Sequence, residues 1–150
     1  MVALPIACRI DGTSLAGDGQ SILPLAYGAD TAPNLIINGD FATDTVWTKG
    51  GGWTIGSGAA SIVGNSGTLS QAYAFVVGAQ YEITFTVTAY TAGAVTPRFT
   101  GGSIVNRTTR SSAGTFTQAL TAATGNTTLG LLASGGSTMS VDNVILRRIR

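Results

Sequence analysis

The side chains that most enzymes use for proton transfer are scarce in this chain of 150 residues. Histidine is absent, which removes Ser-His-Asp and Cys-His catalysis together with the commonest zinc ligand. Ser14 lies in a Gly-Thr-Ser-Leu-Ala run that has part of the pattern of a nucleophile elbow. Ala16 replaces the second glycine of that pattern, and no base is available to activate the hydroxyl. The sequence therefore gives no basis for nucleophilic catalysis.

Carboxylates offer the other route to hydrolysis, because glycosidases use a pair of them. The candidates for such a pair are Asp40, Asp44, Glu82 and Asp142. Glu82 is the only one of these on the polar face of a long predicted strand. The run around Gly56 and Gly58 is a poor dinucleotide fingerprint because no helix follows it. We predict that the protein is not an enzyme.

Two tryptophans are the strongest candidates for a binding site. Trp47 and Trp53 bracket the glycine-rich segment 48–52. Aromatic faces stack on sugar rings, so a pair on such a hairpin could form a glycan platform. The alternative is that both rings lie in the core of the fold. Tyr90 and Arg98 are further ligand-binding candidates, and Tyr73 is a weaker one.

Composition excludes several classes of partner. Only 10% of residues are charged, the formal net charge is +1, and glycine reaches 21. Such a chain has no broad positive surface for nucleic acid or anionic lipid. No apolar run approaches the roughly 20 residues that span a bilayer. We predict no nucleic-acid partner and no membrane insertion; the arginines at 147, 148 and 150 are either a solvated strand end or an anchor on an acidic partner.

A single cysteine limits the covalent and metal chemistry of the chain. Cys8 has no partner for an internal disulfide and cannot assemble a cysteine-based metal site. We interpret it as a small buried apolar side chain.

The longest regular pattern in the sequence spans residues 80–90. Its apolar residues alternate strictly with Glu82 and three threonines, which predicts a strand with one buried face. Similar but shorter runs recur about every ten residues from 34 onward, which is typical of an all-β sandwich. The other predicted strands are 34–38, 46–49, 53–56, 59–63, 68–72, 94–100, 103–106, 115–121, 127–133 and 138–148. In the last of them, the pattern changes phase at Asp142 and Asn143, which indicates a bulge.

Residues 1–32 differ from the rest of the chain. Short apolar bursts are interrupted by prolines and by turn-forming Gly-Asp runs, so neither helical nor alternating periodicity persists. We predict an extended N-terminal arm, 1–32, followed by an antiparallel two-sheet β-sandwich, 33–150. The arm could fold back on its own sandwich or lie on neighbouring subunits. Its expected contacts are Leu4, Ile6, Ile10, Leu23, Leu25 and Tyr27.

Several segments carry a family resemblance. They are the opening run 34–41 (Asn-Leu-Ile-Ile-Asn-Gly-Asp-Phe), Trp47 and Trp53, the run 69–71, and the closing run 140–146 (Ser-Val-Asp-Asn-Val-Ile-Leu). Together these resemble the opening and closing strands of carbohydrate-binding jelly rolls of the family 4/9 type, and similar modules occur in bacteriophage tail-fibre, head-fibre and capsid-decoration proteins.

This resemblance implies a jelly roll in which the first and last strands are neighbours, with Asn38 near Asp142. Some family members hold a structural calcium there, using a carboxylate just after the phenylalanine of the opening run. Ala42 occupies that position here, so one expected ligand is missing. Calcium takes six to eight oxygens, and Asp40, Asp142 and Asn143 supply few of them. No cofactor is predicted; a structural calcium is the one alternative that stays open.

The resemblance and the arm together lead to the functional prediction. We expect a structural protein of the bacteriophage virion surface, made in the host cytoplasm, most simply a capsid decoration or head-fibre-like subunit. The arm would attach it to the major capsid protein or another virion protein, and it would form a homo-oligomer. The alternative is a glycan-binding module that contacts host-surface sugars.

Overall fold

Three long strands form the frame of the fold: β3 (Ala59–Ala72), β4 (Gln80–Thr100) and β7 (Thr128–Arg148). The computed structural model describes residues 32–150, and Asn34–Arg150 form one unit. The shorter strands are β1 (Thr48–Lys49), β2 (Thr54–Gly56), β5 (Val105–Asn106) and β6 (Gly114–Thr121). All pairings are antiparallel, and β7 lies between β3 and β4. Residues 1–31 of the predicted arm lie outside the described residues.

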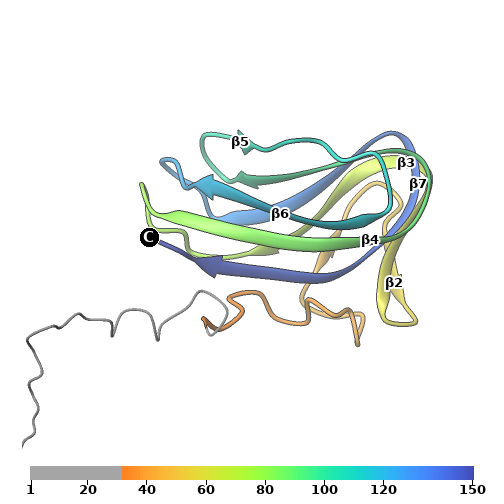
Figure 1. The fold of residues 1–150 in the computed structure, drawn as a ribbon, viewed down its shortest axis with the longest axis horizontal. Coiled ribbons are helices and arrows are strands. Elements are labelled where there is room, and N and C mark those ends of the chain that lie inside the picture. The colour runs from red at the N-terminus through yellow and green to blue at the C-terminus, as the bar shows by residue number, and fades with distance from the viewer. Residues whose placement is uncertain (1–31) are drawn as a thin grey trace, which may run out of the picture. The chain divides into compact units, whose positions relative to one another are not determined.

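The long strands bend back on themselves, so one curled sheet makes both layers of a sandwich (Figure 1). In the first layer, Ile83 of β4 is opposite Leu146 of β7 on one side and Gln118 of β6 on the other. The first part of β3 and then β2 complete this layer. In the second layer, Phe99 of β4 is opposite Leu129 of β7 and Val105 of β5. The second part of β3 and then β1 complete it. The predicted all-β jelly-roll sandwich is confirmed.

Left-handed glycines lie at the bends of all three long strands. Gly64 in β3 has φ 59°, Gly93 in β4 has φ 86°, and Gly135 and Gly136 in β7 have φ 73° and 66°. Side chains other than glycine rarely adopt this conformation. A Cβ on Gly93 would also lie 2.4 Å from the Cα of Ser137. The sequence pattern predicted separate strands on either side of each of these points, and the structure joins each pair into one bent strand.

The core lies between the two layers and follows the predicted alternation. On β4, Tyr81, Ile83, Phe85 and Val87 are buried, whereas the residues between them are partly exposed. Each large apolar side chain buried in this way contributes about 1.5–3 kcal/mol. The second layer supplies the facing apolar side chains, among them Leu69, Val95, Phe99, Leu129 and Leu131.

Buried amide side chains hold the segments at the margins of the sandwich. The Gln71 Nε2–H donates to the Ile37 carbonyl (2.9 Å), and its Oε1 accepts from the Ile37 N–H (2.9 Å). Gln118 makes the same pair of bonds with the backbone of Thr108, at 3.0 and 2.8 Å. Because each amide replaces one step of a β-ladder, these segments are fixed without being strands.

The opening segment 34–38 is held beside β7 but is not a strand, which corrects the predicted strand there. The Leu35 N–H donates to the Leu146 carbonyl (2.8 Å). The Asn34 amide donates to the Val144 carbonyl (3.0 Å) and accepts from the Leu146 N–H (2.9 Å). Its side-chain oxygen also accepts from the Ile36 N–H, which bends the chain away from an extended course.

The predicted bulge in the last strand is confirmed. Between the pairs Thr84–Ile145 and Thr86–Asp142, β7 contains one residue more than β4, and Asn143 has φ 53°. Because of this extra residue, the buried apolar side chains of β7 are at odd-numbered positions before the bulge and at even-numbered positions after it, as the sequence pattern indicated.

Within residues 32–150 there is no helix long and apolar enough to cross a membrane.

Candidate functional site

A row of polar positions crosses all five strands of the second layer. The register places Thr48 of β1 opposite Ser70 of β3, Ser70 opposite Gly130 of β7, Gly130 opposite Arg98 of β4, and Arg98 opposite Asn106 of β5. Directly opposed residues in an antiparallel sheet project on the same face. We call these five residues the polar row. The buried neighbours Leu69, Phe99 and Leu129 alternate with it, so the row faces away from the core.

Arg98 is the central charged group of this row. Its Nη2–H donates to the Thr68 hydroxyl (2.8 Å), which lies on β3 beyond β7. The guanidinium can reach across because Gly130 has no side chain: a Cβ there would lie 3.0 Å from Thr68 Cγ2 and 3.6 Å from Arg98 Cγ. The glycine therefore makes room for the arginine.

The arginine retains donors that the protein does not use. Its Nε is buried and has no hydrogen-bond partner among the described residues. Within residues 32–150 the only ion pair joins Lys49 to Asp44, so no carboxylate there neutralises Arg98. The buried Nε cannot reach a ligand, but the two Nη groups make only one hydrogen bond within residues 32–150. Their remaining N–H groups can donate to a hydroxyl or a carboxylate of a ligand.

The two predicted tryptophans do not contribute a ring face to any surface. Trp47 is 6% exposed and Trp53 3%. The Trp47 indole N–H donates to the Asn38 carbonyl (2.9 Å), and that of Trp53 donates to the Gly67 carbonyl (3.1 Å). Both rings thus occupy the core, which is the second of the two arrangements considered from the sequence, and the proposed stacking platform is not formed by them.

The predicted tyrosines are also packed inward. Tyr90 is half-buried at the bend of β4, where its hydroxyl donates to the Gly93 carbonyl (2.9 Å). Tyr73 packs edge-on against Phe75, with ring centroids 5.0 Å apart. Burial raises the pKa of the Tyr73 phenol above its usual 10.0; Tyr81 adds to this rise and Arg148 opposes it. The predicted ligand residues are therefore not gathered into one site, and only Arg98 lies in the polar row.

None of the ten aromatic residues in the described part of the chain is exposed. Seven are buried, and Tyr73, Tyr90 and Phe116 are half-buried. Over the half-buried Phe116, the guanidinium carbon of Arg110 lies 4.9 Å from the ring centroid. The outer faces are thus formed mainly by small and hydroxyl side chains.

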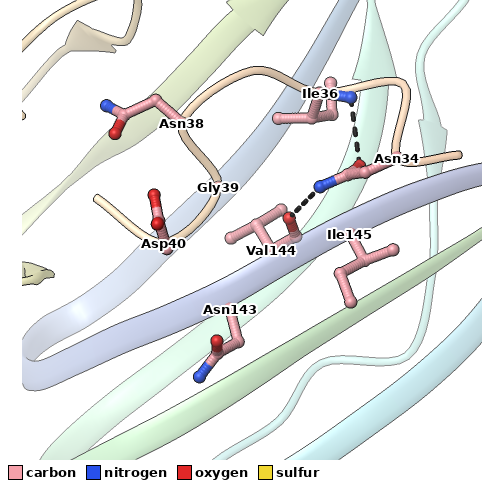
Figure 2. Close-up of a pocket in the computed structure, with 8 residues that line it drawn as sticks. All are labelled: Asn34, Ile36, Asn38, Gly39, Asp40, Asn143, Val144 and Ile145. Atoms are coloured by element: carbon pink, nitrogen blue, oxygen red, sulfur yellow. Dashed lines mark hydrogen bonds between the residues drawn. The ribbon is translucent and has the colours of Figure 1, made fainter. Parts of the chain in front are cut away.

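A hollow with a volume of about 310 Å³ lies between the opening segment and β7. Asn38, Asp40 and Asn143 contribute its polar groups (Figure 2). The backbone around it is strained, because Asn38, Phe41, Val46 and Asn143 all have positive φ. For Val46, a β-branched residue, this conformation is rare.

The polar groups of this hollow do not fit a calcium ion. The Asn38 amide is bonded to the backbone of Thr43 and Thr45. Both oxygens of Asp142 accept from Asn143, and one oxygen of Asp40 accepts from the Ala42 N–H. The polar ends of Asn38, Asp40 and Asn143 point in different directions (Figure 2). No three acidic or other ligating side chains come together within residues 32–150.

Sequence reasoning missed most of the polar row. Thr48, Ser70, Asn106 and Gly130 are small polar or glycine positions with no motif around them. The sequence identifies Arg98 as a ligand-binding candidate, but only the register between distant strands reveals its neighbours. The predicted arm contacts, from Leu4 to Tyr27, lie outside the described residues, as do Cys8 and Ser14.

Comparison with sequence families gave no match to any family model, and no curated protein matched. Solved structures did match. A chain of bacteriophage CBA120 tailspike protein 4, its enzymatically active domain, superposes with a TM-score of 0.53 at 18% identity. That match covers 77% of this chain and 21% of the tailspike chain, so this chain spans about a fifth of it.

Two other structures are similar in outline. A family 29 carbohydrate-binding module has a TM-score of 0.46 at 12% identity, covering 69% of this chain and 79% of that chain. The CBM22-1-GH10 modules of Clostridium thermocellum xylanase 10B, complexed with xylohexaose, give 0.44 at 10%, covering 63% and 22%. At such identities the likeness shows the fold alone. The family 4/9 assignment stays a prediction.

Proposed function

We propose that this chain is a structural protein of the bacteriophage virion surface, in which the sandwich is the displayed body. The observation that carries the proposal is the composition of the outer faces. No described aromatic ring is exposed, and small and hydroxyl side chains outnumber charged ones there. On the first layer, Thr84 bonds Thr117 (2.9 Å) and Thr86 bonds Thr115 (2.9 Å) across β4 and β6. A body of this kind is well suited to display. The similarity in fold to a phage tailspike chain supports the setting.

The finer proposal is a capsid decoration or head-fibre-like subunit that is attached through residues 1–32. The apolar bursts in that segment, at Leu4, Ile6, Ile10, Leu23, Leu25 and Tyr27, are the contacts. About 30 residues laid on neighbouring subunits can bury an interface of standard size, on the order of 1,600 Å². The low charge of the sandwich keeps neighbouring copies from repelling one another.

Incorporation into particles tests this attachment. Full-length chains carrying Leu4→Asp with Ile6→Asp, or Leu23→Asp with Leu25→Asp, should remain folded by circular dichroism but be lost from purified phage particles. Gln20→Asp is the matched control, since it adds the same charge at a polar position of the same segment. Normal incorporation of both double variants would refute attachment through residues 1–32.

A second candidate function, contact with host-surface glycans, is favoured by the polar row. Arg98 and the flanking Ser70, Thr68 and Asn106 offer donors and acceptors for sugar hydroxyls or for the carboxylate of an acidic sugar. Without an exposed aromatic ring, such contacts would be weak individually and would depend on many copies acting together.

A glycan array followed by calorimetry tests this function. Arg98→Ala should weaken binding of any retained oligosaccharide by about tenfold or more, because hydrogen bonds to charged groups contribute about 1.5–3 kcal/mol. Arg147→Ala, on the other layer, is the matched control and should bind as the wild type does. An array on which the wild-type protein retains no glycan would dismiss the candidate.

A further inference from the structure

The outer edge of β6 is the longest edge in the described part of the sandwich. β6 pairs only with β4, in unbroken register from Gly114–Val87 to Thr121–Gln80. Alternate residues of an antiparallel edge strand direct their N–H and C=O groups away from the sheet. No described segment other than β4 makes a backbone hydrogen bond with β6. The edge is therefore open among residues 32–150.

The other edges of the sandwich are short or covered. β2 has three residues, and β1 and β5 have two each. Beyond β5, the chain continues along β4, with the Arg107 N–H donating to the Pro97 carbonyl (3.0 Å) and Arg110 bridging to Val95. Only β6, with eight residues, offers a long template for a further strand.

β6 lacks the devices by which proteins usually block such an edge. Its sequence, Gly-Thr-Phe-Thr-Gln-Ala-Leu-Thr, contains no lysine, other charge or proline. The register with β4 shows no bulge. Edges that must stay unpaired commonly carry one of these features. The absence of all of them along eight residues indicates an edge that is meant to be paired.

We propose that β6 pairs antiparallel with β6 of a second copy of this chain about a two-fold axis. The two first layers then join into one continuous sheet, in the order β2-β3-β7-β4-β6 followed by the same strands reversed. Such an interface is self-complementary, because each copy presents the same surface to the other. It uses neither the polar row nor residues 1–32, so it goes beyond the function proposed above.

The side chains of β6 favour its own copy as the occupant. An uncharged strand meets itself without placing like charges opposite one another. Thr115 and Thr117, which already bond hydroxyls on β4, would continue their row of hydroxyls across the axis. On the inner side, Phe116 is half-buried under the guanidinium of Arg110 of its own copy.

The expected dimer is weak and reversible. One pair of eight-residue strands forms an interface at the low end of the usual range, below about 1,200 Å². On a particle that carries many copies, a high local concentration compensates for a low intrinsic affinity. In solution the pairing should therefore depend on protein concentration over the micromolar range.

The test combines sedimentation velocity of the full chain with hydrogen exchange at low and high concentration. For the wild type, we expect the mass to rise from one chain to two, and the β6 amides to exchange more slowly at high concentration. Ala119→Lys places a positive charge on the outer face of the paired edge in each copy and should remain a single chain. Thr54→Lys, which adds the same charge on the short edge strand β2, should dimerise as the wild type does.

Each alternative outcome overturns the proposal. A wild type that stays a single chain at the highest concentration shows that no pairing occurs. Dimers of Ala119→Lys, or dimers in which β6 exchange does not respond to concentration, place the interface elsewhere. Protection of the β6 amides at every concentration means that another part of the same chain covers the edge. If Ala119→Lys alters the circular dichroism spectrum, Thr121→Lys, at an exposed position at the end of β6, replaces it.

Discussion

The side-chain amides of Gln71 and Gln118 make the pair of hydrogen bonds that the backbone of a neighbouring strand would make. Each offers one donor and one acceptor to the same residue of a marginal segment, Ile37 or Thr108. Both glutamines are buried. The sequence does not reveal either role, because glutamine in a strand is compatible with a solvent-facing position. Only its occurrence at an inward position of the alternation is a signal.

Gln71→Ala should lower the free energy of unfolding by about 1–3 kcal/mol, because it leaves the Ile37 N–H and carbonyl without their partners. Urea unfolding followed by tryptophan fluorescence measures the change. Gln80→Ala is the matched control: its side chain bonds Arg150 at the surface, and its loss should change stability by less than about 0.5 kcal/mol. Equal effects of the two substitutions would contradict the role given to Gln71.

Gly39→Ala tests the close approach between the opening segment and β7. A Cβ on Gly39 would lie 2.0 Å from the Val144 carbonyl oxygen, so the segment must move away from the strand. We expect a loss of about 1–3 kcal/mol, the usual range for overpacking. Gly56→Ala places its methyl in open space and should be nearly neutral. Thermal unfolding of both variants, followed by circular dichroism, compares them directly.

Tyr73 predicts one feature of the dependence of stability on pH. Burial raises its pKa above 10.0 in the folded protein. The unfolded chain then loses this proton at lower pH than the folded one, so the stabilisation is complete below pH 10.0 and is lost as pH rises through the folded pKa. Above pH 10.0, the free energy of unfolding of the Tyr73→Phe variant should decrease less steeply with pH than that of the wild type. Identical urea midpoints across that range in both proteins would contradict the assignment.

The bends of the long strands explain why the straight parts of the strands were predicted correctly and their continuity was not. Alternation within 80–90 correctly identified the first part of β4, because a period of two persists while the strand is straight. At Gly93 the period is interrupted, and a sequence pattern cannot distinguish a bend within a strand from a turn between strands. Gly64, Gly135 and Gly136 hide the continuity of β3 and β7 in the same way.

Gly93→Ala should be more destabilising than Gly136→Ala. Both glycines have positive φ, for which an alanine costs about 1–2 kcal/mol. At Gly93 the new methyl would also meet Ser137, whereas at Gly136 it would meet nothing within 4 Å. The difference between the two unfolding free energies measures the cost of crowding at the Gly93 bend. Equal values would contradict such a cost.

The whole sandwich depends on the opening segment but is expected not to depend on residues before it. A chain that begins at residue 33 retains Asn34, whose amide spans Val144 and Leu146. We expect it to melt within a few degrees of the full chain. A chain that begins at residue 38 loses Asn34 and the Leu35 bond and should melt distinctly lower. Calorimetry of the two truncations compares them, and similar melting temperatures would contradict this role of Asn34.

The polar row shows what assembly of the whole molecule adds to the sequence. Thr48, Ser70, Arg98, Asn106 and Gly130 come from five strands, and their order in the row differs from their order in the chain. Composition and alternation identified the fold class, and Arg98 was a ligand-binding candidate from the sequence alone. The neighbours of Arg98 follow from registers between residues that are tens of positions apart, and a single sequence does not encode those registers in any local pattern.

The position of β7 has a consequence for how the protein is made. β3 and β4 each pair with β7 in both layers and never with one another, although β7 follows both of them in the sequence. A nascent chain therefore cannot close the second layer before residues near 134, or the first layer before residues near 148, have left the ribosome. Until then the apolar faces of β3 and β4 remain open to aggregation or to chaperones. Folding of this sandwich should therefore wait for the synthesis of β7, and a stop codon before residue 128 should leave no stable product.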